Sequence, residues 1–169
     1  MGLKTVSLIG FGDGVGRAVS FAGMNPVTGL PLEPQFFSAS AEDLDWAASL
    51  AESAFPVYSN LSGKDKGAFL RHIAAAIESE ATQIVQRANL ETALPRARLQ
   101  SEIARTCNQL RLFAEVVEES SWVDARIDSK PSIRSMHKPL GPVAVFGASN
   151  FPFGFLRCRG RHSFGPGRK

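Results

Sequence analysis

The chain has 169 residues, of which 44% are hydrophobic and 21% are charged, as in a folded domain or a large part of a bigger one. This composition excludes a disordered or collagen-like chain. Two cysteines are too few for a disulfide framework, and no run of apolar residues is long enough to span a membrane. The formal charge of +3 arises in residues 156–169, which hold five basic groups and no acidic one, whereas the rest carries 14 basic and 16 acidic groups. Because the start of the sequence lacks a signal segment, we expect a cytoplasmic protein. Because no nucleic-acid-binding module precedes the basic tail, we expect no binding of nucleic acid.

Residues 5–37 are predicted to form short strands joined by turns. Residues 5–9 and 17–21 have the composition of strands, and glycines at every second position from Gly10 to Gly16 suggest a hairpin loop between them. A dinucleotide-binding loop would require a glycine where the chain has Val15 or Arg17, so we favour the hairpin over a phosphate-binding loop.

A helix is predicted to begin after Ser40, because Asp43 follows at the spacing of a capping box. Apolar residues then recur at helical spacing, and Pro56 is expected to end or kink the helix. A second helix is expected to begin after Ser62 and to continue to about residue 88, with a buried apolar stripe.

A third helix is expected to begin near Pro95, which suits the first turn of a helix. Its apolar face recurs at close to 3.6 residues. That face consists of Leu99, Ile103, Cys107, Leu110, Ala114 and Val117. Glu115, Glu118 and Glu119 are predicted to form a solvated face of the same helix.

The cysteines and histidines show no catalytic or metal-binding pattern. Cys107 lies on an apolar helical face without a nearby acid–base partner, which favours a buried structural thiol over a nucleophile. Cys158 lies between arginines in the basic tail, and His72, His137 and His162 lack the spacing of metal ligands. We therefore expect no metal site.

Residues 142–146 form a short apolar run of the kind that is buried on both faces of a parallel sheet, which indicates an α/β fold. Small residues and then Asn150 follow, and open α/β sheets bind ligands beyond the carboxyl ends of their strands. Asn150 could donate its side-chain amide to a ligand there. A plain turn asparagine before Phe151-Pro152 is an equally good interpretation of the residues alone.

Residues 140–152 resemble the strand-to-turn segment of the NAD(P)-dependent aldehyde dehydrogenase superfamily. Most members have Pro-Trp-Asn where this chain has Ala148-Ser149-Asn150, and this variant is similar to the α-ketoglutarate semialdehyde (2,5-dioxovalerate) and fatty aldehyde dehydrogenase branch. Further segments similar to that branch are 25–29, 55–58, 91–99 and 109–114. The resemblance covers about residues 7–155.

The resemblance implies an N-terminal β-hairpin, a helical segment and the start of a Rossmann-like parallel sheet. Residues 1–155 would be part of a cofactor-binding domain, with 124–138 corresponding to an oligomerisation arm. In the family, an asparagine at the place of Asn150 stabilises the oxyanion formed when a cysteine thiolate attacks the aldehyde, and hydride then passes to nicotinamide. Phe146, Gly147, Ala148 and Ser149 would line the NAD(P) cofactor.

The nucleophilic cysteine and the glutamate base of the family would lie beyond residue 169. We therefore expect an inactive N-terminal fragment of an aldehyde dehydrogenase, which when intact would be a homo-oligomer acting on a semialdehyde or fatty aldehyde. Residues 156–169 depart from the family pattern and can be read as an out-of-frame tail that follows one inserted base. The alternative is a non-catalytic interaction module that pairs with full-length homologues.

Overall fold

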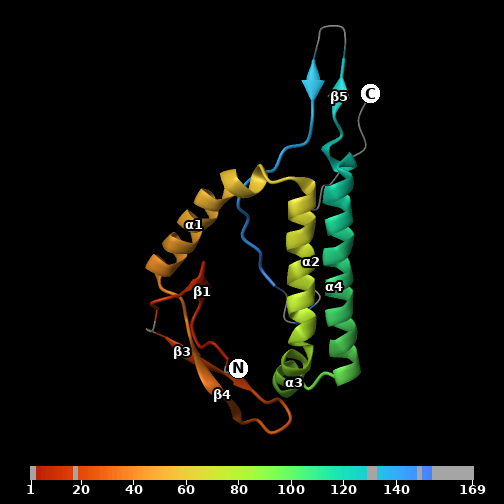
Figure 1. Cartoon of the computed structure of the whole chain (residues 1–169). Helices are drawn as coiled ribbons and strands as arrows, with labels where there is room; N and C mark the ends of the chain where they lie inside the picture. The colour runs from red at the N-terminus through yellow and green to blue at the C-terminus, as the bar shows by residue number, and fades with distance from the viewer. Residues whose placement is uncertain (1–2, 17–18, 129–132, 148–149, 154–169) are drawn as a thin grey trace, which may run out of the picture.

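A computed structural model describes residues 3–16, 19–128, 133–147 and 150–153. These residues form four α-helices, a short 3-10 helix and three two-stranded antiparallel sheets. In Figure 1, α1 leads away from the N-terminal strands, and α2 and α4 lie side by side and antiparallel. None of the helices in this part of the chain is long and apolar enough to cross a bilayer.

The N-terminal segment folds into two small hairpins. Strand β1 (Leu8–Ile9) pairs with β2 (Gly12–Asp13), and β3 (Ser20–Met24) pairs with β4 (Pro31–Phe37). Gly10 has a φ of +59°, which glycine adopts at no steric cost, so the first hairpin closes within the glycine-rich segment. The predicted hairpin loop spanning residues 10–16 is therefore wrong in extent, because strand pairing begins again at Gly12.

Helix α1 (Ala41–Ser59) begins with the predicted capping box. The Asp43 N–H donates to the Ser40 hydroxyl oxygen at 3.1 Å, and the Asp43 carboxylate accepts from the Ser40 N–H at 3.0 Å. The helix does not end at Pro56, since it continues to Ser59. The Asn60 side chain then donates to the Pro56 carbonyl at 2.8 Å and closes the last turn.

The predicted second helix is two helices, α2 (Gly63–Ser79) and α3 (Ala81–Thr92), and the expectation of one continuous helix is wrong. The chain turns at Glu80, which has φ −99° and ψ 2°. This turn brings apolar residues of both α2 and α3 against α4 (Arg96–Glu119), which a single straight helix could not do. Helix α4 begins directly after Pro95, as expected.

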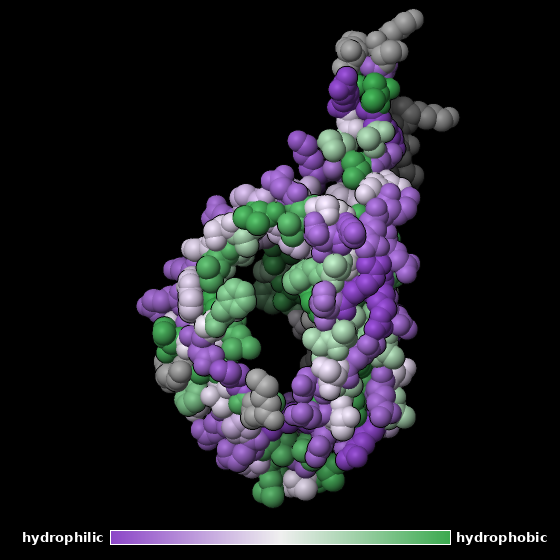
Figure 2. All heavy atoms as spheres, in the orientation of Figure 1, coloured by the Kyte–Doolittle hydropathy of each residue, from purple (hydrophilic) through white to green (hydrophobic). Residues whose placement is uncertain are grey.

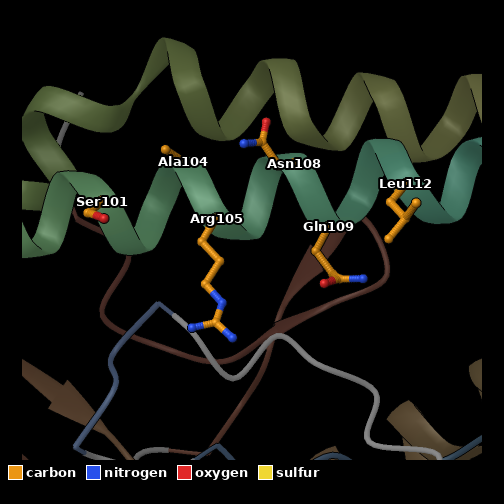
Figure 3. A pocket seen from close by; sticks show the side chains of 6 residues that line it. All are labelled: Ser101, Ala104, Arg105, Asn108, Gln109 and Leu112. Atoms are coloured by element: carbon orange, nitrogen blue, oxygen red, sulfur yellow. The ribbon is translucent and has the colours of Figure 1, made fainter.

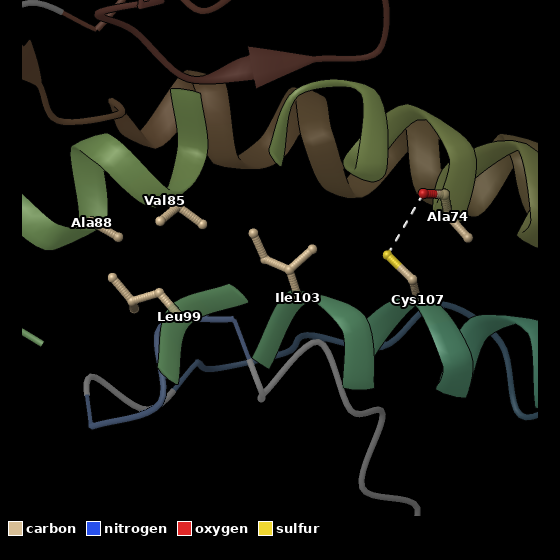
Figure 4. Packing of buried hydrophobic residues seen from close by; sticks show 6 residues of the cluster. All are labelled: Ala74, Val85, Ala88, Leu99, Ile103 and Cys107. Carbon is tan, nitrogen blue, oxygen red and sulfur yellow. Dashed lines mark hydrogen bonds between the residues drawn. The ribbon is translucent and has the colours of Figure 1, made fainter. Parts of the chain in front are cut away.

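The core lies where α2, α3 and α4 meet. Figure 4 shows its buried residues: Ala74, Val85, Ala88, Leu99, Ile103 and Cys107. The predicted face of α4 is confirmed at its centre, and Leu110 and Val117 are half-buried. The stripe of the second predicted helix is only partly buried, because Phe69 remains 51% exposed.

After α4 the chain forms η1 (Ser121–Val123) and a projecting hairpin of β5 (Arg126–Ile127) and β6 (Arg134–Ser135) (Figure 1). Residues 142–146 form no strand, and the predicted start of a parallel sheet is absent from the described residues. A parallel strand takes its hydrogen bonds from neighbouring strands, and no described strand pairs with this segment. Its side chains are largely exposed rather than buried, with Phe146 at 92%.

Candidate functional site

The turn that carries Asn150 lies against the first half of α4. The Arg98 guanidinium donates to the backbone carbonyl of Asn150 at 3.1 Å. The same group lies 5.2 Å above the ring centre of Phe151, within the range of a cation–π contact. Arg98 therefore contacts two successive residues of the turn.

Two further side chains of α4 hold the end of this turn at Phe153. Glu102 accepts the Phe153 N–H at 3.4 Å and the Arg98 Nε–H at 3.1 Å, and the Thr106 hydroxyl donates to the Phe153 carbonyl. Arg98, Glu102 and Thr106 are four residues apart, which places them on one face of the helix. We call these three residues the α4 clamp. The Phe153 side chain packs against the hydrophobic core beside them.

Sequence reasoning missed the α4 clamp, although its spacing was visible. Its residues lie next to the predicted apolar face at Leu99 and Ile103. At such positions the surface of an amphipathic helix is expected to change from buried to solvent-exposed. Glu102 and Thr106 are nevertheless buried, each with an exposed fraction of 7%. Buried polar groups in a fixed helical register require hydrogen-bond partners, and the turn supplies them.

Of the predicted site residues, the structure describes Asn150, Phe146 and Gly147, whereas Ala148 and Ser149 lie outside the described residues. Asn150 is exposed, and its side-chain amide makes no hydrogen bond to the described part of the chain. A Cβ added at Gly147 would meet no atom within 4 Å. The backbone at Gly147 is thus open on the side where a Cβ would lie.

Three hollows on the described part of the chain lie away from this turn. Hollows of about 420 and 160 Å³ lie on α4 and between α3 and α4, and one of about 210 Å³ lies between Leu3 and α3. None of these three is lined by Asn150, Phe146 or Gly147. Figure 3 shows the largest, whose six lining residues all belong to α4. A nicotinamide cofactor needs an enclosing site, so Phe146 and Gly147 would supply only one side of it.

Cys107 is a buried structural thiol, as the sequence predicted. Its side chain is completely buried, and its Sγ lies 3.6 Å from the Ala74 carbonyl oxygen (Figure 4). Burial raises the pKa of the Cys107 thiol, with a smaller effect in the same direction from Glu78. Both effects disfavour the thiolate that a nucleophile requires. Cys158 lies outside the described residues.

The histidines of the described chain make local structural contacts. His72 Nδ1 lies 2.9 Å from the Ala68 carbonyl oxygen, and His137 Nδ1 lies 2.9 Å from that of Trp122. No cluster of potential metal ligands forms among the described residues. His162 lies outside them.

Glu118, an exposed member of the predicted solvated face of α4, also joins two helices. Glu118 accepts from the Arg71 guanidinium at 2.7 Å, so this ion pair connects α4 to α2. The hydrogen bond from Arg71 holds the pKa of the Glu118 carboxyl below its usual value. Glu115 and Glu119 are exposed, as predicted.

Comparison with known proteins identifies the class to which this fold belongs. The chain superimposes on the crystal structure of HpcC from Thermus thermophilus with a TM-score of 0.76, over 89% of this chain and 30% of that one, at 21% identity. It also superimposes on aldehyde dehydrogenase 21 from Physcomitrella patens with a TM-score of 0.71, over 86% of this chain and 31% of that one, at 22% identity. The α/β class is therefore confirmed, as part of a larger fold.

Sequence relatives lead to the same family. Residues 16–159 match the aldehyde dehydrogenase family, and the chain belongs to it. It is 38% identical to alpha-ketoglutaric semialdehyde dehydrogenase 2 of Azospirillum brasilense, over 92% of this chain and 31% of the relative. It is 40% identical to alpha-ketoglutaric semialdehyde dehydrogenase of Acinetobacter baylyi, over 74% of this chain and 26% of the relative. The chain thus spans less than a third of the length of these relatives.

Proposed function

We propose that this chain is the N-terminal part of an NAD(P)-dependent enzyme that oxidises a semialdehyde of the 2,5-dioxovalerate type, or a fatty aldehyde, to a carboxylate. The two curated relatives described above support the semialdehyde, since both are named alpha-ketoglutaric semialdehyde dehydrogenases. The observation that carries the proposal is the exposed side chain of Asn150, at the start of a turn that α4 holds by its backbone.

In the proposed reaction, Asn150 stabilises negative charge on the substrate. When a nucleophile adds to the aldehyde carbon, the carbonyl π electrons move to oxygen, and the Asn150 amide N–H donates a hydrogen bond to that oxygen. A fixed donor at a developing oxyanion typically contributes about 10²–10³ in rate. Phe146 and Gly147 would hold NAD(P)+, which would supply the hydride acceptor, and the backbone of Gly147 leaves room for its approach.

The remaining groups are proposed to come from the larger part of the enzyme. Cys107 is buried in the core and does not match the place of the family's nucleophile. The nucleophilic cysteine and the glutamate base would follow residue 169, so the 169-residue chain alone is expected to be inactive. We also propose that residues 1–155 form part of the cofactor-binding domain, that 124–138 serves as an oligomerisation arm in a homo-oligomer, and that 156–169 is an out-of-frame tail.

A hybrid enzyme tests the proposed activity. Residues 16–153 would replace the aligned segment of the Azospirillum brasilense relative, and formation of NAD(P)H would be followed by absorbance with 2,5-dioxovalerate and a fatty aldehyde. Turnover by the hybrid but not by the 169-residue chain is expected. An inactive hybrid that folds and binds NAD(P)+, or turnover by the isolated chain, would contradict the proposal.

A pairing module is the second candidate, and the uncovered segment around residues 140–146 favours it. Leu140 is 93% exposed and Phe146 is 92% exposed, so this segment offers apolar side chains and unpaired backbone groups to a partner. Affinity capture with the purified chain as bait should recover an aldehyde dehydrogenase subunit under this alternative. A monomeric chain that captures none would count against it.

A further inference from the structure

Buried side chains of α4 lie beside exposed residues where the turn of residues 150–153 contacts this helix. Glu102 and Thr106 are each only 7% exposed, whereas Asn150 and Phe151 at the start of the turn are exposed. We propose that the α4 clamp fixes the orientation of the Asn150 side chain, which makes Arg98, Glu102 and Thr106 positioning residues for that donor. The catalytic meaning of this inference rests on the proposed function.

The contacts of the clamp restrain both ends of the turn through its backbone. Arg98 holds the carbonyl of Asn150, while Glu102 and Thr106 hold the N–H and the carbonyl of Phe153. Hydrogen bonds are directional, so together they limit rotation of the turn about its own axis. Because the backbone at Asn150 is held, the direction of its Cα–Cβ bond is also held, and the side-chain amide remains available.

No strand ladder performs this restraint in the described chain. Residues 142–147 carry no regular structure, and the structure pairs none of them with a strand. The apolar contact of Phe153 with the core anchors the turn but does not orient it, since hydrophobic contacts have no preferred direction. The oriented contacts therefore come from α4.

Charge balance explains why the clamp contains both Arg98 and Glu102. A buried carboxylate requires an opposite charge or hydrogen-bond donors, and Arg98 lies 3.1 Å away as an i,i+4 partner. Arg98 is itself 43% exposed, so it spans from the buried carboxylate to the surface turn. The same guanidinium thus neutralises Glu102 and contacts Asn150.

Amide hydrogen exchange in the complete 169-residue chain tests the clamp without any assay of activity. Thr106→Val keeps the side-chain shape but removes the hydroxyl that donates to Phe153. Losing one buried hydrogen bond should accelerate exchange of the Phe153 N–H by about tenfold. Thr106→Ser restores the hydroxyl and should return the rate to within about twofold of the wild type, by the same argument.

Thr82→Val is the matched control, because it makes the same substitution at an exposed position on α3. Its exchange at Phe153 should equal that of the wild type, and the Ile103 amide in α4 should stay protected in every variant. Equal exchange in the Thr106→Val and Thr82→Val chains, or no recovery in Thr106→Ser, would overturn the clamp. If Thr106→Val unfolds α4, Arg98→Lys provides a second variant. Lysine keeps the positive charge beside Glu102 but loses the planar contact of the guanidinium with the turn. Unchanged exchange at Phe153 in Arg98→Lys would then overturn the clamp.

The hybrid enzyme separates this inference from the proposed function. Thr106→Val should lower kcat by about tenfold while KM for NAD(P)+ stays constant, and Thr106→Ser should restore kcat. A hybrid in which Asn150→Ala lowers kcat but Thr106→Val does not would leave the proposed function standing and overturn the positioning role.

Discussion

The Asp43 carboxylate is the most highly connected side chain at the start of α1. It is 1% exposed and accepts hydrogen bonds from the backbone N–H groups of Val15 at 2.7 Å, Gly16 at 2.7 Å and Ser40 at 3.0 Å. The bond from Ser40 and then that from Val15 hold the pKa of the Asp43 carboxyl below its usual value. This residue therefore ties the glycine-rich segment to the helix.

Asp43→Asn should lower the melting temperature at pH 7 by roughly 5 °C, because it removes the charge and one acceptor from this group of donors. Since the folded-state pKa is depressed, the stabilisation is complete above the ordinary aspartate pKa of about 4 and is lost as the pH falls through the lower folded value. The difference between the two proteins should therefore shrink on acidification. Thermal melts from pH 7 to pH 3 measure it.

Asp45→Asn is the control for this pH series, because Asp45 is exposed on the same helix. It should change the melting temperature little at any pH. A constant gap between wild type and Asp43→Asn across the series would contradict the role given to the ionised carboxylate.

Ala93 ends α3 in the left-handed conformation, with a φ of +55°, which is unfavourable for any residue with a Cβ. Ala93→Gly should therefore stabilise the protein by about 0.5–1 kcal/mol in urea denaturation. Ala104→Gly, at an exposed position inside α4, should instead destabilise it by about 1 kcal/mol. Equal effects of the two substitutions would show that Ala93 does not adopt this cap conformation.

The contact between α2 and α4 depends on two glycines of α2. A Cβ at Gly63 would lie 2.3 Å from the Val117 carbonyl oxygen, which is backbone and cannot move aside. A Cβ at Gly67 would meet the Glu118 carboxylate at 2.4 Å, which is the end of a flexible side chain. The close approach of the two helices therefore tolerates a side chain at Gly67 better than at Gly63.

Gly63→Ala should destabilise the protein by about 1–3 kcal/mol, although alanine has the higher helix propensity, since overpacking outweighs propensity here. Gly67→Ala should cost less, because Glu118 can change rotamer. Gly147→Ala serves as the control and should leave stability unchanged, as the added Cβ meets no atom within 4 Å. Urea titration measures all three, and a stabilised Gly63→Ala variant would contradict the packing described.

At the scale of elements, local signals predicted where helices begin better than where they end. Ser40 and Asp43 predicted the start of α1, and Pro95 that of α4, because capping chemistry is contained in adjacent residues. The break at Glu80 has no glycine or proline to mark it. It arises because α2 and α3 both pack on α4, which is a tertiary effect that periodicity within one segment cannot reveal.

The molecule as a whole leaves much of its apolar surface uncovered. Figure 2 shows an opening framed by the region of α1, the N-terminal strands and α2, with hydrophobic side chains at its edge. Leu44 of α1 is 69% exposed and Val57 is also 69% exposed, despite the helical spacing of the apolar residues. Sequence reasoning identified apolar residues but not what covers them, since the covering elements need not belong to the same segment.

This contrast predicts two different costs for truncating leucines. Leu99→Ala, in the fully buried core, should destabilise the protein by about 2–5 kcal/mol. Leu44→Ala should change stability by less than about 0.5 kcal/mol, because its side chain is already in contact with water. Similar losses in urea denaturation would mean that the exposed face of α1 is covered in solution.

The candidate site shows the same division between local and tertiary information. The position of Asn150 after an apolar run could be read from the sequence, and so could the resemblance to the aldehyde dehydrogenase family. The clamp could not, because Arg98 and Asn150 are 52 residues apart and only folding brings them together. The predicted strand at 142–146 failed for the related reason that a strand requires a partner.

The kinetics of Asn150→Ala in the hybrid enzyme test the account most directly. With 2,5-dioxovalerate and NAD(P)+, the substitution should lower kcat by about 10²–10³ while the KM for NAD(P)+ changes little, because the amide acts on the transition state rather than on cofactor binding. A hybrid that retains full kcat after Asn150→Ala would contradict the assignment of Asn150 as the oxyanion donor.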